Sequence, residues 1–378
     1  MDPNTQGTIG KKWYTSAILV PFLIVAAIFV YFLVTQMDTD SEADVEKTQS
    51  STSGLELALN MTHFIESTLT PENVFTLRYT CSLTPNGMCV PEGTDSSSNE
   101  GNGPVPHSGY AILSFYNTGN KTNNPEMAER SRILTDTMVD RCKDDTLYCE
   151  WNFFPLYRFA IDTGDAKYKN AMLSITDTLL KDYTYDEYIS NNIPSKLNMI
   201  YEVSGDEKFK DKLVEIAEET LATPLENRND NDFVYLSDSG YAVREGSIQT
   251  VWGIYIPAYL ATKNAAYRDA ARDYFLNAEL AEKAQYTSVA GVTALVKGVE
   301  ALTAMETIDP QYAPFYKDEA HKIMQYLIQQ FVDTPENEKA TADYGVIVGT
   351  EKLVNMTGWV ASTLANEMPE EIFTYSRY

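Results

Sequence analysis

The chain has 378 residues, of which 44% are hydrophobic, so it is long and apolar enough to bury a sizeable core. It carries 54 acidic side chains against 29 basic ones, which gives a formal net charge of -25 at pH 7. This excess of negative charge argues against nucleic acid or anionic lipid as a partner of the folded part, and it suits a salty or cation-rich exterior.

The first predicted element is a transmembrane helix over residues 16–36. This run has no charged side chain, and its length of about 20 residues is what a helix needs to cross a bilayer. Lys11 and Lys12 precede it and acidic residues follow it, so the positive-inside tendency keeps residues 1–15 in the cytoplasm. A cleaved signal peptide is the alternative, but the run is long for one and no small-x-small cleavage pattern follows it.

An acidic stalk is predicted over residues 37–54, which are rich in Ser, Thr, Asp and Glu and poor in apolar side chains. The stalk would join the membrane helix to an extracytoplasmic domain over residues 55–378. The lipid bilayer is therefore a predicted partner through the N-terminal helix, and proteins at the cell surface are further candidates.

The four cysteines form two pairs that are close in sequence, Cys81 with Cys89 and Cys142 with Cys149. None of them has CxxC spacing and the chain has only three histidines, so the pattern does not predict a metal site. Outside the membrane, such pairs favour two local disulfides. No metal ion and no cofactor are expected.

N-glycosylation patterns begin at Asn60, Asn120 and Asn355. Because this modification applies only to the outer side of the membrane, Asn60 and Asn120 are candidate acceptors. Asn355 falls in a predicted inner helix and is expected to stay unmodified.

A short pattern repeats along the folded part: a turn, then Asp or Asn, then an aromatic residue three positions later. Its copies are Asp165 with Tyr168, Asp206 with Phe209, and Asn264 with Tyr267. Looser copies at Asn124 and Asp309 place Pro at the first helical position. Each Asp or Asn is predicted to cap a helix by accepting from its first free backbone N–H groups.

Each cap opens a helix with one apolar face, and a more apolar helix alternates with it. The amphipathic helices are predicted over residues 55–69, 126–141, 166–183, 207–221, 265–282 and 311–331. The apolar helices are predicted over residues 110–115, 151–161, 196–203, 248–260, 289–302 and 353–364. Pro155 and Pro257 should kink or shorten two apolar helices, and Trp252 and Trp359 are assigned to the core.

About six such hairpins predict an inner barrel of apolar helices wrapped by an outer ring, with an open superhelical solenoid as the alternative. The hairpins, with turns such as Thr163-Gly164-Asp165 and Ser204-Gly205-Asp206 leading into an aromatic residue, resemble the (α/α)6 toroid superfamily. That superfamily contains glycoside hydrolases, sugar epimerases and uronate-processing enzymes. The resemblance covers the chain from about Leu55 onward and implies an all-α (α/α)6 toroid. It carries over no catalytic residue.

The predicted connections from an outer helix to the next inner helix are long, whereas those in the other direction are mostly tight turns. The long connections span residues 70–108, 142–149, 184–194, 222–244 and 332–350. In a closed ring they would gather at one end, here called the long-loop rim, which both disulfides would stiffen. Toroid families place their sites at such an end.

Loop carboxylates near the starts of the inner helices are the candidate catalytic residues: Asp238, Glu245 and Asp343. Two carboxylates about 5 to 10 Å apart can hydrolyse a glycosidic bond. Aromatic faces stack on sugar rings and polar side chains bind hydroxyls, so the candidate substrate-binding residues are Glu150, Trp151, Tyr185, Tyr235, Tyr241, Arg244 and Tyr344. In so acidic a chain, solvated surface charge is the competing explanation for these carboxylates.

The sequence thus predicts a membrane-anchored extracytoplasmic protein that binds or processes a glycan, with a glycoside hydrolase-like site at the long-loop rim. The alternative is a scaffold or interaction subunit of a surface or membrane complex, without catalysis.

Overall fold

Helices alternate with short connections and strands in the folded unit, Ser50–Tyr375. The computed structural model describes residues 50–375 apart from 71–72, 74, 82–88, 95–107, 185–186, 189–190, 223–233, 237–241, 278–288 and 338. The predicted membrane helix and residues 37–49 of the stalk lie outside this range. Among the described helices, none combines the length and the apolar character that a membrane span needs.

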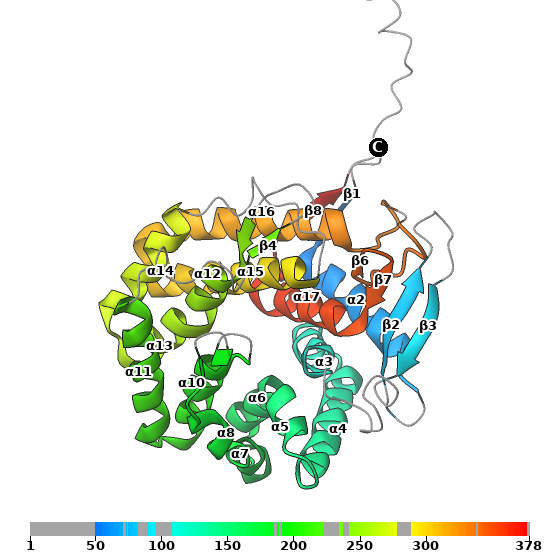
Figure 1. Ribbon diagram of the computed structural model, residues 1–378. Helices are drawn as coiled ribbons and strands as arrows, with labels where there is room; N and C mark the ends of the chain where they lie inside the picture. The colour runs from blue at the N-terminus through cyan, green and yellow to red at the C-terminus, as the bar shows by residue number, and fades with distance from the viewer. Residues whose placement is uncertain are drawn as a thin grey trace, which may run out of the picture. The chain divides into compact units, whose positions relative to one another are not determined.

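The inner helices are arranged around a common centre (Figure 1). They are α3 (Gly109–Lys121), α6 (Phe153–Thr163), α10 (Ile193–Ser204), the joined α12 (Glu245–Thr250), η2 (Val251–Tyr255) and α13 (Ile256–Thr262), α15 (Val289–Ile308), and α17 (Val354–Glu367). Each contacts the next, and α17 packs against α3. A Cβ atom on Gly358 would lie 2.4 Å from the Cα atom of Ala111, so glycine permits this closure. The ring is closed, as predicted.

An outer helix follows each of the first five inner helices and packs against it. The outer helices are α4 (Pro125–Cys142), α7 (Ala166–Leu173) with α8 (Thr176–Leu180), α11 (Glu207–Ala222), α14 (Ala265–Asn277) and α16 (Ala313–Phe331). The first outer helix, α2 (Gly54–Ser67), packs against both α17 and α3 and completes the sixth pair. A short helix, α5 (Leu147–Trp151), precedes α6.

The predicted caps explain where most outer helices begin. Asp165, Asp206, Asn264 and Asn124 each accept a hydrogen bond from a backbone N–H of the first turn. Asp309 was wrongly predicted as a cap. It is buried, and it accepts from the Tyr316 hydroxyl at 3.0 Å and from Arg272 at 3.2 Å.

Both internal prolines lie near the start of a helical segment. Pro155 lies in the first turn of α6, which begins anew after Asn152 ends α5. Pro257 lies in the first turn of α13, directly after the π-helical segment η2. The first turn of α6 tolerates the missing N–H donor of Pro155, because that donor would have no intrahelical acceptor, whereas Pro257 follows a π-helical turn.

Short antiparallel strands correct the prediction of an all-α domain. A sheet in the order β3-β2-β7-β6 contains Cys89–Thr94, Thr76–Cys81, Glu351–Leu353 and Ile347–Val348. Two further pairs are β4 (Val234–Leu236) with β5 (Ala242–Arg244), and β1 (Ser50–Ser53) with β8 (Ile372–Tyr375). The folded unit therefore begins within the predicted stalk.

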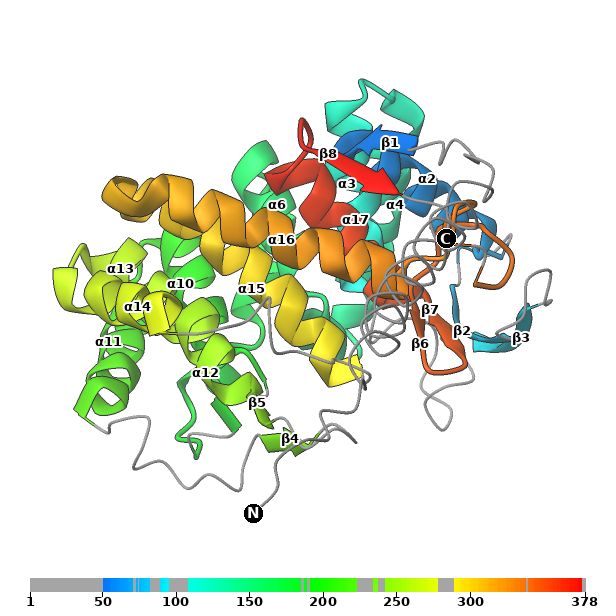
Figure 2. The ribbon, with the colours of Figure 1, turned by 90° about the horizontal axis from the view of Figure 1, so that it is seen from above.

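The strands occupy both ends of the ring (Figure 2). The four-stranded sheet and the β4–β5 pair lie at the end where the inner helices begin, whereas β1 and β8 lie toward the other end, where β8 contacts α16. Strand β2 lies in the predicted connection 70–108, and β7 directly follows the predicted connection 332–350, so their pairing brings these two connections together at the long-loop rim. Both predicted disulfides are present, Cys81–Cys89 and Cys142–Cys149.

Candidate functional site

Several predicted site residues lie outside the described part of the chain. Asp238, Tyr185 and Tyr241 are among them. For Glu245, Arg244 and Tyr235 the structure gives only the backbone position, at the start of α12, in β5 and in β4. The catalytic roles of Asp238 and Glu245 therefore stay predictions.

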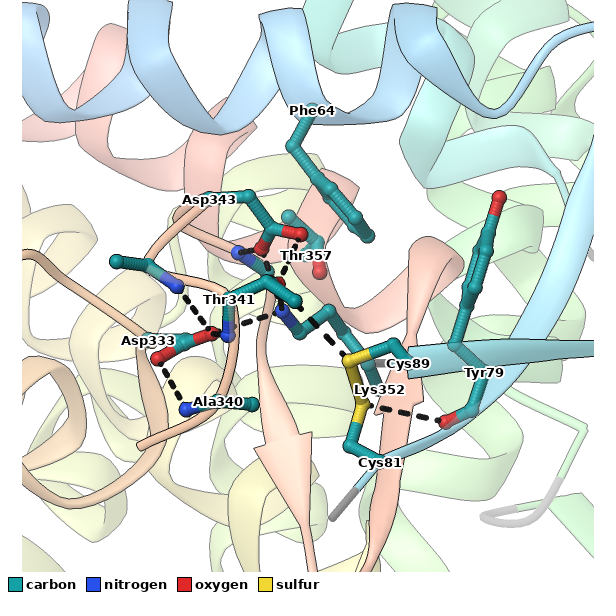
Figure 3. A network of polar contacts seen from close by, with 12 residues as sticks. Phe64, Tyr79, Cys81, Cys89, Asp333, Ala340, Thr341, Asp343, Lys352 and Thr357 are labelled. Carbon is teal, nitrogen blue, oxygen red and sulfur yellow. Dashed lines mark hydrogen bonds and ion pairs between the residues drawn. A yellow bond between two sulfur atoms is a disulfide. The ribbon is translucent and has the colours of Figure 1, made fainter. Parts of the chain in front are cut away.

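Asp343 belongs to a buried polar network in the connection from α16 to α17 (Figure 3). Its Oδ1 atom lies 2.5 Å from Nζ of Lys352, and its Oδ2 atom accepts from the Thr341 hydroxyl at 2.7 Å. The Lys352 ammonium also pairs with Asp333 at 2.8 Å, and both of these side chains are fully buried. Both oxygens of Asp343 thus bond to its own loop and strand.

Asp333 organises the same loop. Its carboxylate accepts backbone N–H groups from residues 340–342 at 2.9 to 3.0 Å. The Phe64 ring of α2 lies on one side of this network, with its centroid 5.4 Å from Nζ of Lys352. Three backbone donors and a buried ammonium bind this carboxylate, so this cluster fixes the loop between α16 and α17.

The remaining described candidates lie near the starts of α6 and α17. Trp151, at the end of α5, is 46% exposed, and its neighbour Glu150 is partly buried. Tyr344 is half-buried, with a positive φ of 68°. Lys196 of α10 is buried, and burial lowers its pKa to about 8 against the opposing effect of Glu150. The structure thus brings Glu150 into the electrostatic field of a buried amine.

The most concentrated functional chemistry lies inside the ring and was not predicted from the sequence. Glu300 of α15 accepts hydrogen bonds from the indole N–H groups of Trp252 at 2.8 Å and Trp359 at 2.7 Å. The hydroxyl of Thr363 donates to the same carboxylate at 2.9 Å. Three successive inner elements, η2, α15 and α17, therefore meet at one carboxylate.

Aromatic rings surround this carboxylate. Tyr110 stacks on Trp359 with ring centroids 4.0 Å apart and planes inclined by 7°. Phe154 lies 5.3 Å from Tyr110 and 6.2 Å from Trp252 between ring centroids. Nζ of Lys297 lies 4.9 Å from the Trp252 ring centroid. The seven residues of this axial cluster are Tyr110, Phe154, Trp252, Lys297, Glu300, Trp359 and Thr363.

The electrostatics of the axial cluster are set by burial. Burial raises the pKa of Glu300 to about 7, although the three hydrogen bonds favour the ionised form. The pKa of Tyr110 is raised well above its ordinary value by burial and by the negative charge of Glu300. A carboxyl group with such a pKa can both give and take a proton near neutral pH.

Part of the axial cluster remains accessible. Tyr110, Phe154, Trp252 and Glu300 are only partly buried, whereas Trp359 is 5% exposed. Tyr110 and Phe154 are the second residues of α3 and α6, so they lie toward the long-loop rim. The axial cluster therefore begins toward the long-loop rim at Tyr110 and Phe154 and reaches deeper into the ring at Glu300, past the middle of α15.

Sequence reasoning assigned Trp252 and Trp359 to the core and passed over Glu300. The available signal was a single carboxylate, one turn after Lys297, in the most apolar stretch of an inner helix. A charged residue in such an apolar stretch needs hydrogen-bond partners when it is buried, and the indole N–H groups of two tryptophans on other inner helices were the available candidates. Among the described residues, no group of His, Cys, Asp or Glu side chains is placed to hold a metal ion.

Comparison with known proteins identifies the architecture. No family model and no curated protein sequence matches the chain. An unsaturated glucuronyl hydrolase from Streptococcus agalactiae is similar, with a TM-score of 0.56 and 15% identity over 82% of this chain and 89% of that one. The unsaturated glucuronyl hydrolase from Bacillus sp. GL1 has a TM-score of 0.55 and 11% identity over 83% of this chain and 95% of that one. An unsaturated glucuronyl hydrolase described as specific for heparin has a TM-score of 0.53 and 15% identity over 82% of this chain and 95% of that one.

The folded unit shares the (α/α)6 toroid fold of these neighbours, as predicted. At identities of 11 to 15% the likeness concerns the fold.

Proposed function

We propose that this chain is a membrane-anchored extracytoplasmic protein that binds a glycan at the axial cluster and cleaves it by a glycoside hydrolase-like reaction. The observation that carries the proposal is the carboxylate of Glu300, a partly buried residue, which lies among aromatic rings inside an (α/α)6 ring. Aromatic faces pack on the C–H faces of sugars, and a carboxyl group with a pKa near 7 suits proton transfer to a glycosidic oxygen.

The structural neighbours support the choice of a glycan. The Bacillus sp. GL1 enzyme is described as responsible for the degradation of glycosaminoglycan, and a Streptococcus agalactiae variant was solved with a bound disaccharide. The location is supported by the sequence, through the apolar run over residues 16–36 and the acidic residues that follow it. Both disulfides suit an oxidising exterior.

A non-catalytic scaffold is the second candidate, and Asp343 favours it. This predicted catalytic residue has both carboxylate oxygens bound within its own loop. If the carboxylates near the long-loop rim only stabilise loops, the ring would present a surface for protein partners and perform no chemistry.

The test is a glycan-binding array combined with a mass-spectrometric screen for released sugars, both on the full-length protein in detergent. We expect binding to a defined class of glycans and a product shortened by hydrolysis. Asp238→Ala and Glu245→Ala test the two sequence-predicted carboxylates on the same substrate. If the protein binds a glycan but releases no product, the non-catalytic scaffold is favoured. If it shows no binding and no product, the glycan proposal is wrong.

A further inference from the structure

We propose that Glu300 is the proton donor of the axial cluster and that the Tyr110 hydroxyl positions the sugar beside it. This inference rests on the proposed glycan cleavage and names the groups that carry it out. Neither residue was predicted as a site residue from the sequence. Both lie on inner helices, whereas the predicted catalytic carboxylates lie near the long-loop rim.

The hydrogen bonds to Glu300 fix the orientation of its carboxyl group. Oε1 accepts from Trp359 and Thr363, whereas Oε2 accepts from Trp252. A carboxyl oxygen has two lone pairs, so among the described donors Oε2 keeps one position open. The proton would reside there, on a group that cannot rotate without breaking bonds to two neighbouring helices.

Tyr110 supplies a second feature that points to a polar ligand. Its hydroxyl is buried and has no hydrogen-bond partner among the residues that the structure describes. The ring is held by stacking on Trp359, whose indole donates to Glu300. The buried amide oxygen of Asn355, one turn before Trp359 on α17, also lacks a partner within the described chain. Buried polar atoms are usually satisfied, and sugar hydroxyls would satisfy these.

The reaction balances with one water molecule. Glu300 gives its proton to the glycosidic oxygen while the bond from the anomeric carbon to that oxygen breaks, and the electron pair goes to the leaving oxygen. Water adds to the anomeric carbon and loses a proton to the Glu300 carboxylate. The acid is restored, one water is consumed, and two hydroxyl-bearing sugars are released.

The titrating surroundings of Glu300 come from several helices. Tyr110 lies on α3, Lys297 lies one turn earlier on α15 beside the same two indoles, and Glu367 lies at the end of α17. The negative charge of Glu367 favours the protonated form of Glu300. Turnover should therefore fall as the pH rises through about 7, because the proton donor is then lost.

The experiment measures kcat/KM against pH for the wild type, Glu300→Gln and Trp252→Phe on the glycan found by the screen. Glu300→Gln keeps the shape but cannot give a proton, so we expect turnover to fall by about 10² to 10⁴-fold with sugar affinity changed less than about threefold. Trp252→Phe removes a donor that favours the ionised form, so the alkaline limb should move to higher pH. Glu306→Gln, on the same helix and outside the axial cluster, should behave as the wild type.

Each outcome decides between the claims. If the wild type cleaves and a folded Glu300→Gln cleaves equally well, the proton-donor assignment is overturned while the proposed function stands. If Glu300→Gln does not fold, Trp252→Phe decides, because an unmoved alkaline limb contradicts the assignment. A wild type that neither binds nor cleaves any glycan overturns both claims.

Discussion

At the scale of single residues, the informative groups are buried charges whose partners lie far away in the sequence. Glu300 bonds to tryptophans 48 and 59 positions away, and no local pattern signals such a contact. The disulfides were predictable because each joins cysteines 7 or 8 positions apart. The sequence could therefore place the covalent links but not the centre of the candidate site.

Glu300 makes the stability of the fold depend on pH. Its pKa rises from 4.5 to about 7 on folding, so between these values the folded protein binds a proton that the unfolded chain has lost. The free energy of unfolding should then decrease as the pH rises from about 4.5 to 7, by at most about 3 kcal/mol. Urea denaturation between pH 4.5 and 7 measures this decrease. In the Glu300→Gln variant the free energy of unfolding should depend less steeply on pH. An equal slope in the variant would contradict the assigned shift.

Lys352 carries a second prediction at this scale. Lys352→Met would leave the buried Asp333 carboxylate and its neighbour Asp343 without their cation. Loss of one partner of a buried pair costs about 3–5 kcal/mol, which urea denaturation would measure. Lys322→Met, which breaks exposed pairs on α16, is the matched control and should change little. If the two variants are equally stable, the network does not hold the loop.

At the scale of elements, the helices were predictable because their caps and apolar stripes are local. The inner helix α3 was placed over residues 110–115 but runs to Lys121, because its polar end offers no apolar periodicity. The strands were missed for a different reason. The strands of the four-stranded sheet have two to six residues and lie within long connections, too short for a sustained alternation of apolar and polar side chains.

Two glycines on inner helices test how closely these elements pack. Gly358→Ala would push a Cβ atom to 2.4 Å from Ala111 and should cost about 1–3 kcal/mol by separating α17 from α3. Gly298→Ala is the matched control, because its Cβ atom would meet no neighbour closer than 3.8 Å. Helix propensity should make that variant about 0.5–1 kcal/mol more stable. Thermal unfolding of both variants measures their change in stability relative to the wild type, and we expect Gly358→Ala to be less stable and Gly298→Ala more stable.

At the scale of the whole molecule, hairpin count and loop asymmetry predicted a ring with one elaborated end. Closure itself rests on α17 packing against α3 and α2, contacts between opposite ends of the folded unit that sequence periodicity cannot show. The predicted site residues were sought in the loops of the long-loop rim. The richest cluster lies deeper, on the inner helices, where carboxylates were not expected.

The proposed location gives a prediction for the intact chain. The full-length protein should stay with the membrane fraction after a high-salt wash, and protease added to intact cells should digest the folded unit. Deletion of residues 16–36 should release it from the membrane fraction, because the remaining chain has no comparable apolar run. Protection of the folded unit from protease would contradict the extracytoplasmic orientation.

The central claim is that a glycan binds at the axial cluster. Calorimetric titration of the glycan selected by the array into the wild type, Trp252→Ala and Leu260→Ala tests it most directly. Leu260 lies on α13, in the same joined inner helix as Trp252, and is 43% exposed. We predict that Trp252→Ala weakens binding at least tenfold whereas Leu260→Ala binds as the wild type. Equal affinity of a folded Trp252→Ala variant would contradict the account.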